Sequence, residues 1–120
     1  MFTRLAAALV GFACALAFAQ TPSPVQTEAA DQASAEAREI YSQQGPREAL
    51  PKFEHALSLY QKAGDRKGEA ITLGHIGNCH KRLGDLPRAL DYLQRALAMK
   101  HELGDRLEEG KTLSHLGLVY

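Results

Sequence analysis

The sequence contains one passage twice. Residues 64–80 read GDRKGEAITLGHIGNCH, and residues 104–120 read GDRLEEGKTLSHLGLVY. At a fixed offset of 40 residues and with no gap, eight of these 17 positions are identical. The same offset places two Ala and two Leu residues of segment 49–57 on the same residue types in segment 89–97. A regular internal period of this length is typical of solenoid proteins, in which each unit buries its apolar face against the next.

Each period predicts a pair of helices. In residues 73–83, apolar or small side chains recur at spacings of three and four, which places them on one face of a helix. Residues 89–97 carry a second apolar face with the same spacing. Between helices, a glycine is expected to end one helix and the following aspartate to cap the next, with Pro87 in a first turn. These pairs are Gly64-Asp65, Gly84-Asp85 and Gly104-Asp105, the last completed as a capping box by Glu108.

Gly77 and Gly117 lie inside the predicted helices, at equivalent positions of the repeat. Glycine inside a helix costs about 1 kcal/mol relative to alanine, so its recurrence indicates a close approach of two helices. The small residues Ala89 and Ala96 of the next helix fit the same interpretation. We therefore expect both glycines to touch the neighbouring helix, and we expect Gly77→Leu to unfold the pair.

The first unit departs from the pattern of the other two. Its first helix, around residues 33–40, has no Leu-Gly pair, and Gln44 stands where the turn glycine is expected. Pro51 falls a few residues into the second helix, although proline fits only a first turn. The sequence therefore predicts an atypical terminal unit whose second helix begins late or bends, with a loose backbone over residues 47–52.

The N-terminus has the layout of a secretory signal peptide. Arg4 precedes 15 apolar or glycine residues, and Ala17-Phe18-Ala19 forms a cleavage site before the polar Gln20. A membrane-spanning helix needs about 20 apolar residues, which is more than this run provides. Residues 1–19 are therefore predicted to direct export to the periplasm or the outside of the cell and to be removed. Residues 20–30, rich in proline and small polar residues, are predicted to form a linker.

Composition excludes several classes of function. The chain has 14 basic and 14 acidic residues and a net charge of zero, so it has no general electrostatic attraction for nucleic acid. With 45% hydrophobic residues, it is too apolar for a fully disordered protein. Its length allows at most one domain, and its many Ala and Leu residues favour helix.

No residue pattern indicates catalysis, a cofactor or a metal. The five histidines include no pair four residues apart, and no phosphate-binding loop, G-x-S-x-G or C-x-x-C motif occurs. His80 is predicted to pack in or beside the core. Without residues 1–19, Cys79 is the single cysteine, so we expect no disulfide and a buried, apolar thiol. The sequence predicts a binding protein rather than an enzyme.

The repeated residues resemble the tetratricopeptide repeat. In that family the first helix carries a large apolar residue, Leu-Gly and an aromatic residue, and the second carries Ala, an aromatic residue or Leu, and Ala. The matching residues are Leu73, Ile76-Gly77, His80, Ala89, Leu93 and Ala96 in the second unit, and Leu113, Leu116-Gly117 and Tyr120 in the third. The period of 40 exceeds the usual 34 and is similar to that of kinesin light chains and of bacterial arrays that precede CHAT peptidase domains.

The resemblance implies an all-α fold, a right-handed superhelical solenoid of antiparallel helix pairs. The repeat region would cover residues 31–120 with about two and a half repeats, in units of about 29–64, 65–104 and an incomplete 105–120. First helices line the concave side of such an array and can hold a peptide backbone or a carboxylate. The candidate peptide-binding residues are Arg38, His75, Asn78, Lys81, Arg82, Lys111 and His115, with Ser34, Tyr41, Ile71, Gly74, Ser114 and Leu118 in the other groove-facing slots.

Four of these candidates are basic residues of the first helices, so a modestly basic groove and an acidic peptide partner are expected. Ordinary solvated helix surface is the alternative for any one of these residues. The third unit stops within its first helix, since Tyr120 aligns with His80. Leu113, Leu116 and the last two residues would then face an open end, so we expect the sequence to be truncated there. The alternative is that residues 105–120 pack on the second unit as a solvating helix.

Three functions follow as candidates from the sequence. The first is an exported scaffold that binds protein or peptide partners in its groove. The second is a docking or regulatory array of a larger exported enzyme such as a CHAT-type peptidase. The third is a structural module that self-associates through its open C-terminal helix face. None of the three requires a cofactor, nucleic acid or a membrane span.

Overall fold

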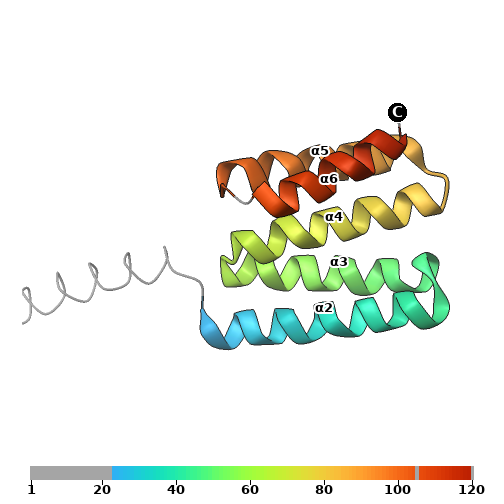
Figure 1. Cartoon of the computed structure of the whole chain (residues 1–120). Coiled ribbons are helices and arrows are strands. Elements are labelled where there is room, and N and C mark those ends of the chain that lie inside the picture. The colour runs from blue at the N-terminus through green and yellow to red at the C-terminus, as the bar shows by residue number, and fades with distance from the viewer. Residues whose placement is uncertain (1–22, 105, 120) are drawn as a thin grey trace, which may run out of the picture.

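The computed structural model describes residues 23–104 and 106–119, and these residues form helices and no strand (Figure 1). The predicted all-α array is confirmed. The five helices are α2 (Pro24–Gln44), α3 (Pro46–Ala63), α4 (Arg66–Arg82), α5 (Leu86–Glu102) and α6 (Arg106–Val119).

Each helix packs against the next one in the chain, so that the helices run back and forth in a stack (Figure 1). In addition, the backbone of α4 approaches those of α2 and α6. The backbones of α3 and α5, both described along their whole length, do not approach each other in this way. The array therefore curves toward the side formed by α2, α4 and α6, which is its concave face.

Glycines and aspartates end and begin the helices as predicted. Gly64, Gly84 and Gly104 have positive φ angles between 69° and 83°, the left-handed conformation that stops a helix. Asp65 accepts a hydrogen bond from the backbone N–H of Gly68 at 3.0 Å, and Asp85 accepts one from Arg88 at 3.3 Å. The predicted capping box of Asp105 and Glu108 lies outside the described residues and side chains.

The turn of the first unit lies one residue later than expected. Gly45, with φ 103°, separates α2 from α3, so the chain keeps its turn glycine beside Gln44. Helix α3 begins directly after it with Pro46 in the first turn, and it continues through Pro51. The expectation of a late start is therefore wrong. Pro51 has no N–H, which leaves the Arg47 carbonyl without its usual helical donor. Pro51 is exposed, so its ring meets solvent rather than a neighbouring helix.

The predicted linker is largely helical. Helix α2 begins at Pro24, and Ala30 is fully buried beside Ala56 and Tyr60 of α3. The backbone N–H of Ser23 donates to the carbonyl of Ala63 at 3.2 Å, which ties the start of α2 to the end of α3. Proline is accommodated at the first position of a helix, so Pro24 starts α2 rather than preventing it. The predicted signal peptide and residues 20–22 lie outside the described residues.

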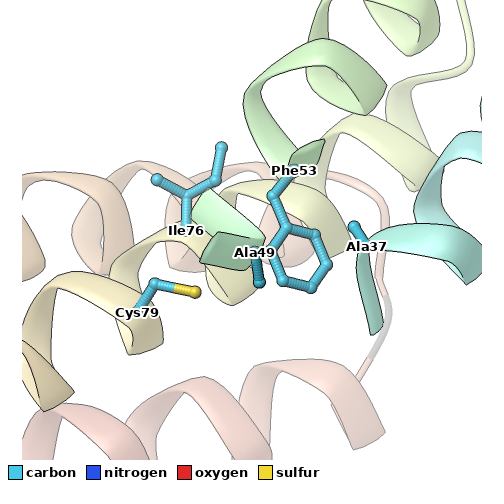
Figure 2. Packing of buried hydrophobic residues seen from close by; sticks show 5 residues of the cluster. All are labelled: Ala37, Ala49, Phe53, Ile76 and Cys79. Carbon is cyan, nitrogen blue, oxygen red and sulfur yellow. The ribbon is translucent and has the colours of Figure 1, made fainter. Parts of the chain in front are cut away.

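The main core cluster joins the first two units (Figure 2). It contains Ala37 of α2, Ala49 and Phe53 of α3, and Ile76 and Cys79 of α4, all of them almost completely buried. Burial raises the pKa of the Cys79 thiol to about 11, so the prediction of a buried, apolar cysteine is confirmed.

Gly77 makes the expected close approach to the neighbouring helix. A Cβ atom at Gly77 would lie 2.7 Å from Cγ of Leu93 and 3.2 Å from its backbone nitrogen, so α4 and α5 touch there as predicted. A Cβ atom at Gly117 would have no described atom within 4 Å. No described helix packs against position 117, so the close approach expected at Gly117 stays a prediction.

Helix α6 packs on the second unit. It contacts α5 and approaches α4. Leu116 is only 7% exposed, contrary to the expectation that it faces an open end, whereas Leu113 is 52% exposed. The side chains of Val119 and Tyr120 lie outside what the structure describes.

Candidate functional site

Two adjoining hollows lie on the concave face. The first encloses about 190 Å³ and receives side chains from α2, α3 and α4. The second is smaller, about 50 Å³, and lies between α4, α5 and α6. His75 of α4 lines both, so the two hollows meet at this imidazole.

The first hollow has aromatic walls and a polar rim. The Phe53 ring stacks on the His75 ring with 5.0 Å between their centres and 20° between their planes. The Asn78 amide nitrogen donates to the Tyr41 hydroxyl at 3.4 Å, and the Arg82 guanidinium lies 5.7 Å from the centre of the Tyr41 ring. These contacts orient four of the five lining side chains. The lining residues are Arg38, Tyr41, Phe53, His75 and Asn78.

The second hollow is basic. Its lining residues are Ile71, Gly74, His75, Lys100, Lys111, Thr112 and His115. Two of these carry ammonium groups and two carry imidazoles, and the described residues that line either hollow include no aspartate or glutamate. A neutral chain thus concentrates positive charge at one place on its concave face.

Lys100 forms the floor of the second hollow. It belongs to α5, the outer helix of its unit, and its side chain reaches inward between α4 and α6, where the residue is only 4% exposed. Its Nζ donates to Oγ1 of Thr112 at 2.6 Å. A Cβ atom at Gly74 would lie 3.1 Å from this Nζ, so the glycine leaves the space that the ammonium occupies.

His115 lies half-buried in the same hollow. Burial lowers its pKa below the usual 6.5, and the positive charges of Lys81, Lys100 and Arg82 lower it further. The imidazole is therefore neutral at neutral pH. An anion that enters the hollow would offset those positive charges and favour its protonated form.

The structure brings most of the predicted site residues together. Arg38 and Asn78 line the first hollow, Lys111 and His115 line the second, and His75 lines both. Lys81 and Arg82 lie near enough for their positive charges to lower the pKa of His115, and Arg82 also contacts the Tyr41 ring. Ser34, another position predicted to face the groove, is buried and hydrogen-bonded to Tyr60, so it is part of the packing between α2 and α3.

Sequence reasoning missed Phe53, Lys100 and Thr112 as lining residues. Phe53 aligns with Leu93, and its ring, which is buried in the core, also forms a wall of the first hollow. Lys100 did leave a signal, because it continues the apolar stripe Ala89, Leu93 and Ala96 at a spacing of four. A lysine on a buried stripe must bring its ammonium to a polar partner or a polar opening.

His80 is a packing residue rather than a site residue. His80 is buried, stacks on Tyr92 with 5.4 Å between ring centres, and lies 4.0 Å from a carboxylate oxygen of Asp85. The core placement predicted for His80 is thus confirmed. Within the described parts of the chain, no three His, Cys, Asp or Glu side chains gather as a metal site would require.

None of the helices that the structure describes is both long and apolar enough to span a bilayer.

Comparison with known proteins identifies the repeat. A sequence profile of the tetratricopeptide repeat matches residues 39–102. Two similar proteins are response regulator aspartate phosphatase A of Bacillus subtilis, 39% identical over 49 residues, and tetratricopeptide repeat protein 29 of Trypanosoma brucei brucei, 40% identical over 47 residues. The matched segments cover 41% and 39% of this chain but only 13% and 10% of these relatives. The chain therefore spans a small part of their length.

Proposed function

The chain belongs to the tetratricopeptide repeat family, and on that basis we propose that it binds a partner peptide on the concave face of α2, α4 and α6. Repeats of this family generally mediate protein–protein interaction and are typically non-catalytic. The observation that carries the proposal is the pair of adjoining hollows, which gathers five of the seven predicted groove residues at one place.

The charge of the groove favours an acidic partner. Arg38 lines the first hollow, Lys100 and Lys111 line the second, and the charges of Lys81 and Arg82 reach His115. Charge-assisted hydrogen bonds from lysine and arginine to carboxylates are stronger than neutral ones. A peptide rich in Asp or Glu would find complementary charge here without any surplus on the whole chain.

A peptide selection tests this function. The full chain is panned against a random nine-residue peptide library displayed on phage, and the enriched peptides are synthesised for affinity measurement. We expect Arg38→Ala combined with Asn78→Ala to weaken binding at least tenfold. The matched control combines His55→Ala with Lys62→Ala, two exposed positions of α3 outside both hollows, and should bind as well as the original chain. Equal loss in both double variants, or enrichment of no peptide, would refute groove binding.

The phosphatase named among the relatives does not extend this proposal to catalysis. The shared segment is 49 residues, or 13% of that protein. In this chain the described side chains of the two hollows include no carboxylate and no cysteine, so the arrangement favours binding of an anion over nucleophilic attack.

Export is a separate part of the proposal and is supported by the N-terminal sequence. Arg4, the apolar run to Ala19 and the Ala17-Phe18-Ala19 site match the features that a signal peptidase requires. When the full chain is produced in a Gram-negative host, the periplasmic or secreted form should begin at Gln20, as intact mass shows. The Ala19→Arg variant should remain uncleaved. A cytoplasmic product that retains residues 1–19 would contradict export.

A further inference from the structure

We propose that Tyr41 is a positioning residue of the groove, whose hydroxyl on α2 holds the Asn78 amide of α4 in place for the backbone of a bound peptide. The inference rests on the proposed function, because it requires a peptide on the concave face. It adds a task for the atypical first unit, which prepares a binding side chain of the second unit before the peptide arrives.

Tyr41 joins two side chains of α4. Its hydroxyl accepts a hydrogen bond from the Asn78 amide nitrogen at 3.4 Å, and the Arg82 guanidinium lies over its ring, 5.7 Å from the ring centre. Asn78 and Arg82 are four residues apart, so they project from the same side of α4, one turn from each other. A single ring of α2 therefore contacts two consecutive turns of α4.

The ring of Tyr41 keeps the hydroxyl at one place. It is half-buried and packs against the main core cluster of the first two units. The guanidinium of Arg82 is attracted to the face of the same ring. Both contacts restrict rotation of the phenol, so its hydroxyl stays at the first hollow, which Tyr41 lines.

The amide of Asn78 depends on this hydroxyl for its orientation. The bond between Cβ and the amide group of an asparagine rotates within broad limits, so an amide without a partner samples many orientations. Within the described parts of the chain, the Tyr41 hydroxyl is the hydrogen-bond partner of the Asn78 side chain. With one amide hydrogen donated to it, a second hydrogen and the carbonyl oxygen remain for a peptide backbone.

An amide that is ordered in the free chain should bind a peptide more tightly. A side chain that becomes ordered only on binding loses rotational freedom at that moment, and the loss weakens the complex. For one side chain, this loss corresponds to roughly three- to tenfold in affinity. The loss is avoided where Tyr41 already holds the amide.

The contact between Tyr41 and Asn78 is not a copy of the repeat. The offset of 40 residues places Tyr41 on Lys81 and Arg38 on Asn78. The second unit therefore has no tyrosine at the equivalent position. The hydroxyl that meets Asn78 is a feature of the first unit alone among the two.

A double-mutant cycle on peptide affinity tests the inference. The strongest peptide from the phage selection is measured with the original chain, Tyr41→Phe, Asn78→Ala and the double variant. Tyr41→Phe should bind about three- to tenfold more weakly than the original chain. In the Asn78→Ala background, the same substitution should change the affinity by less than about twofold. Independent losses, or equal binding by Tyr41→Phe and the original chain, would overturn the inference.

Tyr92→Phe is the matched control. Tyr92 is half-buried on α5, and the Arg95 guanidinium lies over its ring at 5.4 Å, much as Arg82 lies over Tyr41. Tyr92 is not among the described residues that line the hollows, so loss of its hydroxyl should leave the affinity unchanged. Thermal denaturation should give both variants a melting temperature close to that of the original chain. Unfolding of Tyr41→Phe would overturn the inference, because its hydroxyl would then be required by the fold.

The side-chain amide of Asn78 provides a readout that a change in stability alone would not move. Asn78 is the single asparagine of the chain, so isotope-labelled asparagine gives one pair of side-chain amide signals in NMR spectra. Relaxation of this nitrogen should show a more mobile amide in free Tyr41→Phe than in the free original chain or free Tyr92→Phe. Saturating peptide should reduce the mobility to the same level in all three. An amide equally mobile in the three free chains would overturn the inference.

Failure of the inference differs from failure of the proposed function. Enrichment of no peptide would refute groove binding, on which the inference depends. An enriched peptide that binds Asn78→Ala as tightly as the original chain would overturn the inference alone, because Arg38 and the rest of the groove would then hold the peptide without the amide.

Discussion

The absence of a side chain at position 77 sets how closely α4 and α5 approach. Leu93 occupies the space in which a Cβ atom of residue 77 would lie. The same repeat position at 117 opens to space free of described atoms. The described helices therefore show a close-packing role for Gly77.

Substitution by alanine should have opposite effects at these two glycines. Gly77→Ala should destabilise the fold by about 1–3 kcal/mol, because Leu93 and the backbone of α5 must shift to accept the new methyl group. Gly117→Ala should leave stability unchanged or raise it by up to about 1 kcal/mol, because alanine is the better helix former. Thermal and urea denaturation of the two variants measure this difference. Equal effects of both substitutions would show that α4 and α5 do not touch at Gly77.

His115 should make the stability of the fold depend on pH. Its pKa is lowered in the folded chain, so the unfolded chain binds a proton first as the pH falls below about 6.5. The folded state is therefore not penalised by His115 above about pH 6.5. Below it, stability is lost progressively until the pH reaches the lower pKa of His115 in the folded chain. We expect the free energy of unfolding to fall less steeply between pH 7 and 5 in His115→Gln than in the original chain.

The control for this pH dependence is His55→Gln. His55 is exposed on α3 and lies outside both hollows, so its replacement should leave the slope of stability against pH close to that of the original chain. If His115→Gln had no smaller slope than His55→Gln, the positive surroundings assigned to His115 would be wrong.

At the scale of the element, α3 tolerates a proline that interrupts its hydrogen bonds. Helix α3 buries Ala49, Phe53, Ala56, Tyr60 and Ala63 along one face. Pro51 lies between the first two of these on the exposed side. The tertiary contacts of the buried face hold the helix together across the missing bond, because helix stability in proteins comes mainly from packing.

The two prolines of α3 should differ in their effect on stability. Pro51→Ala restores an N–H for the Arg47 carbonyl and should stabilise the fold by about 1–3 kcal/mol, with slower amide exchange over residues 47–52. Pro46→Ala, in the first turn, restores no helical hydrogen bond and should change stability by less than about 1 kcal/mol. Urea denaturation together with hydrogen exchange measures both effects. A destabilised Pro51→Ala variant would mean that the proline ring has a packing role.

At the scale of the whole molecule, α4 is the central element. It approaches all four other described helices, whereas α6 approaches only α4 and α5. Eight residues of α4 are buried, among them Ile76 and Cys79 of the core cluster that joins the first two units. In an array of this kind, each helix is stabilised mainly by its direct neighbours.

Hydrogen exchange should therefore reveal a gradient along the array. In the full chain, the amides of α4 should exchange most slowly and those of α6 fastest, because local opening of α6 disrupts the fewest contacts. Mass spectrometry of deuterated peptides resolves the two helices. Protection of α6 equal to that of α4 would show that the array unfolds as one cooperative unit.

The sequence by itself determined the period of 40, the helix pairs, the glycine and aspartate turns and the close contact at Gly77. All of these depend on residues near one another in the chain or on the repeat itself, so periodicity and capping chemistry suffice to predict them. Periodicity and capping did not predict the start of α2. Its first turns look like a polar linker, and only burial of Ala30 against Ala56 and Tyr60 shows that they are helical.

The tertiary structure alone decided how the groove is built. Phe53 and His75 stack across two helices, and Lys100 reaches Thr112 from the outer helix of its unit. The repeat pattern gave neither Phe53 nor Lys100 a role in the groove, because periodicity does not determine the direction of a side chain across a packed interface. The physical reason is that these contacts depend on how tightly neighbouring helices approach, which Gly74 and Gly77 permit only once the helices are assembled.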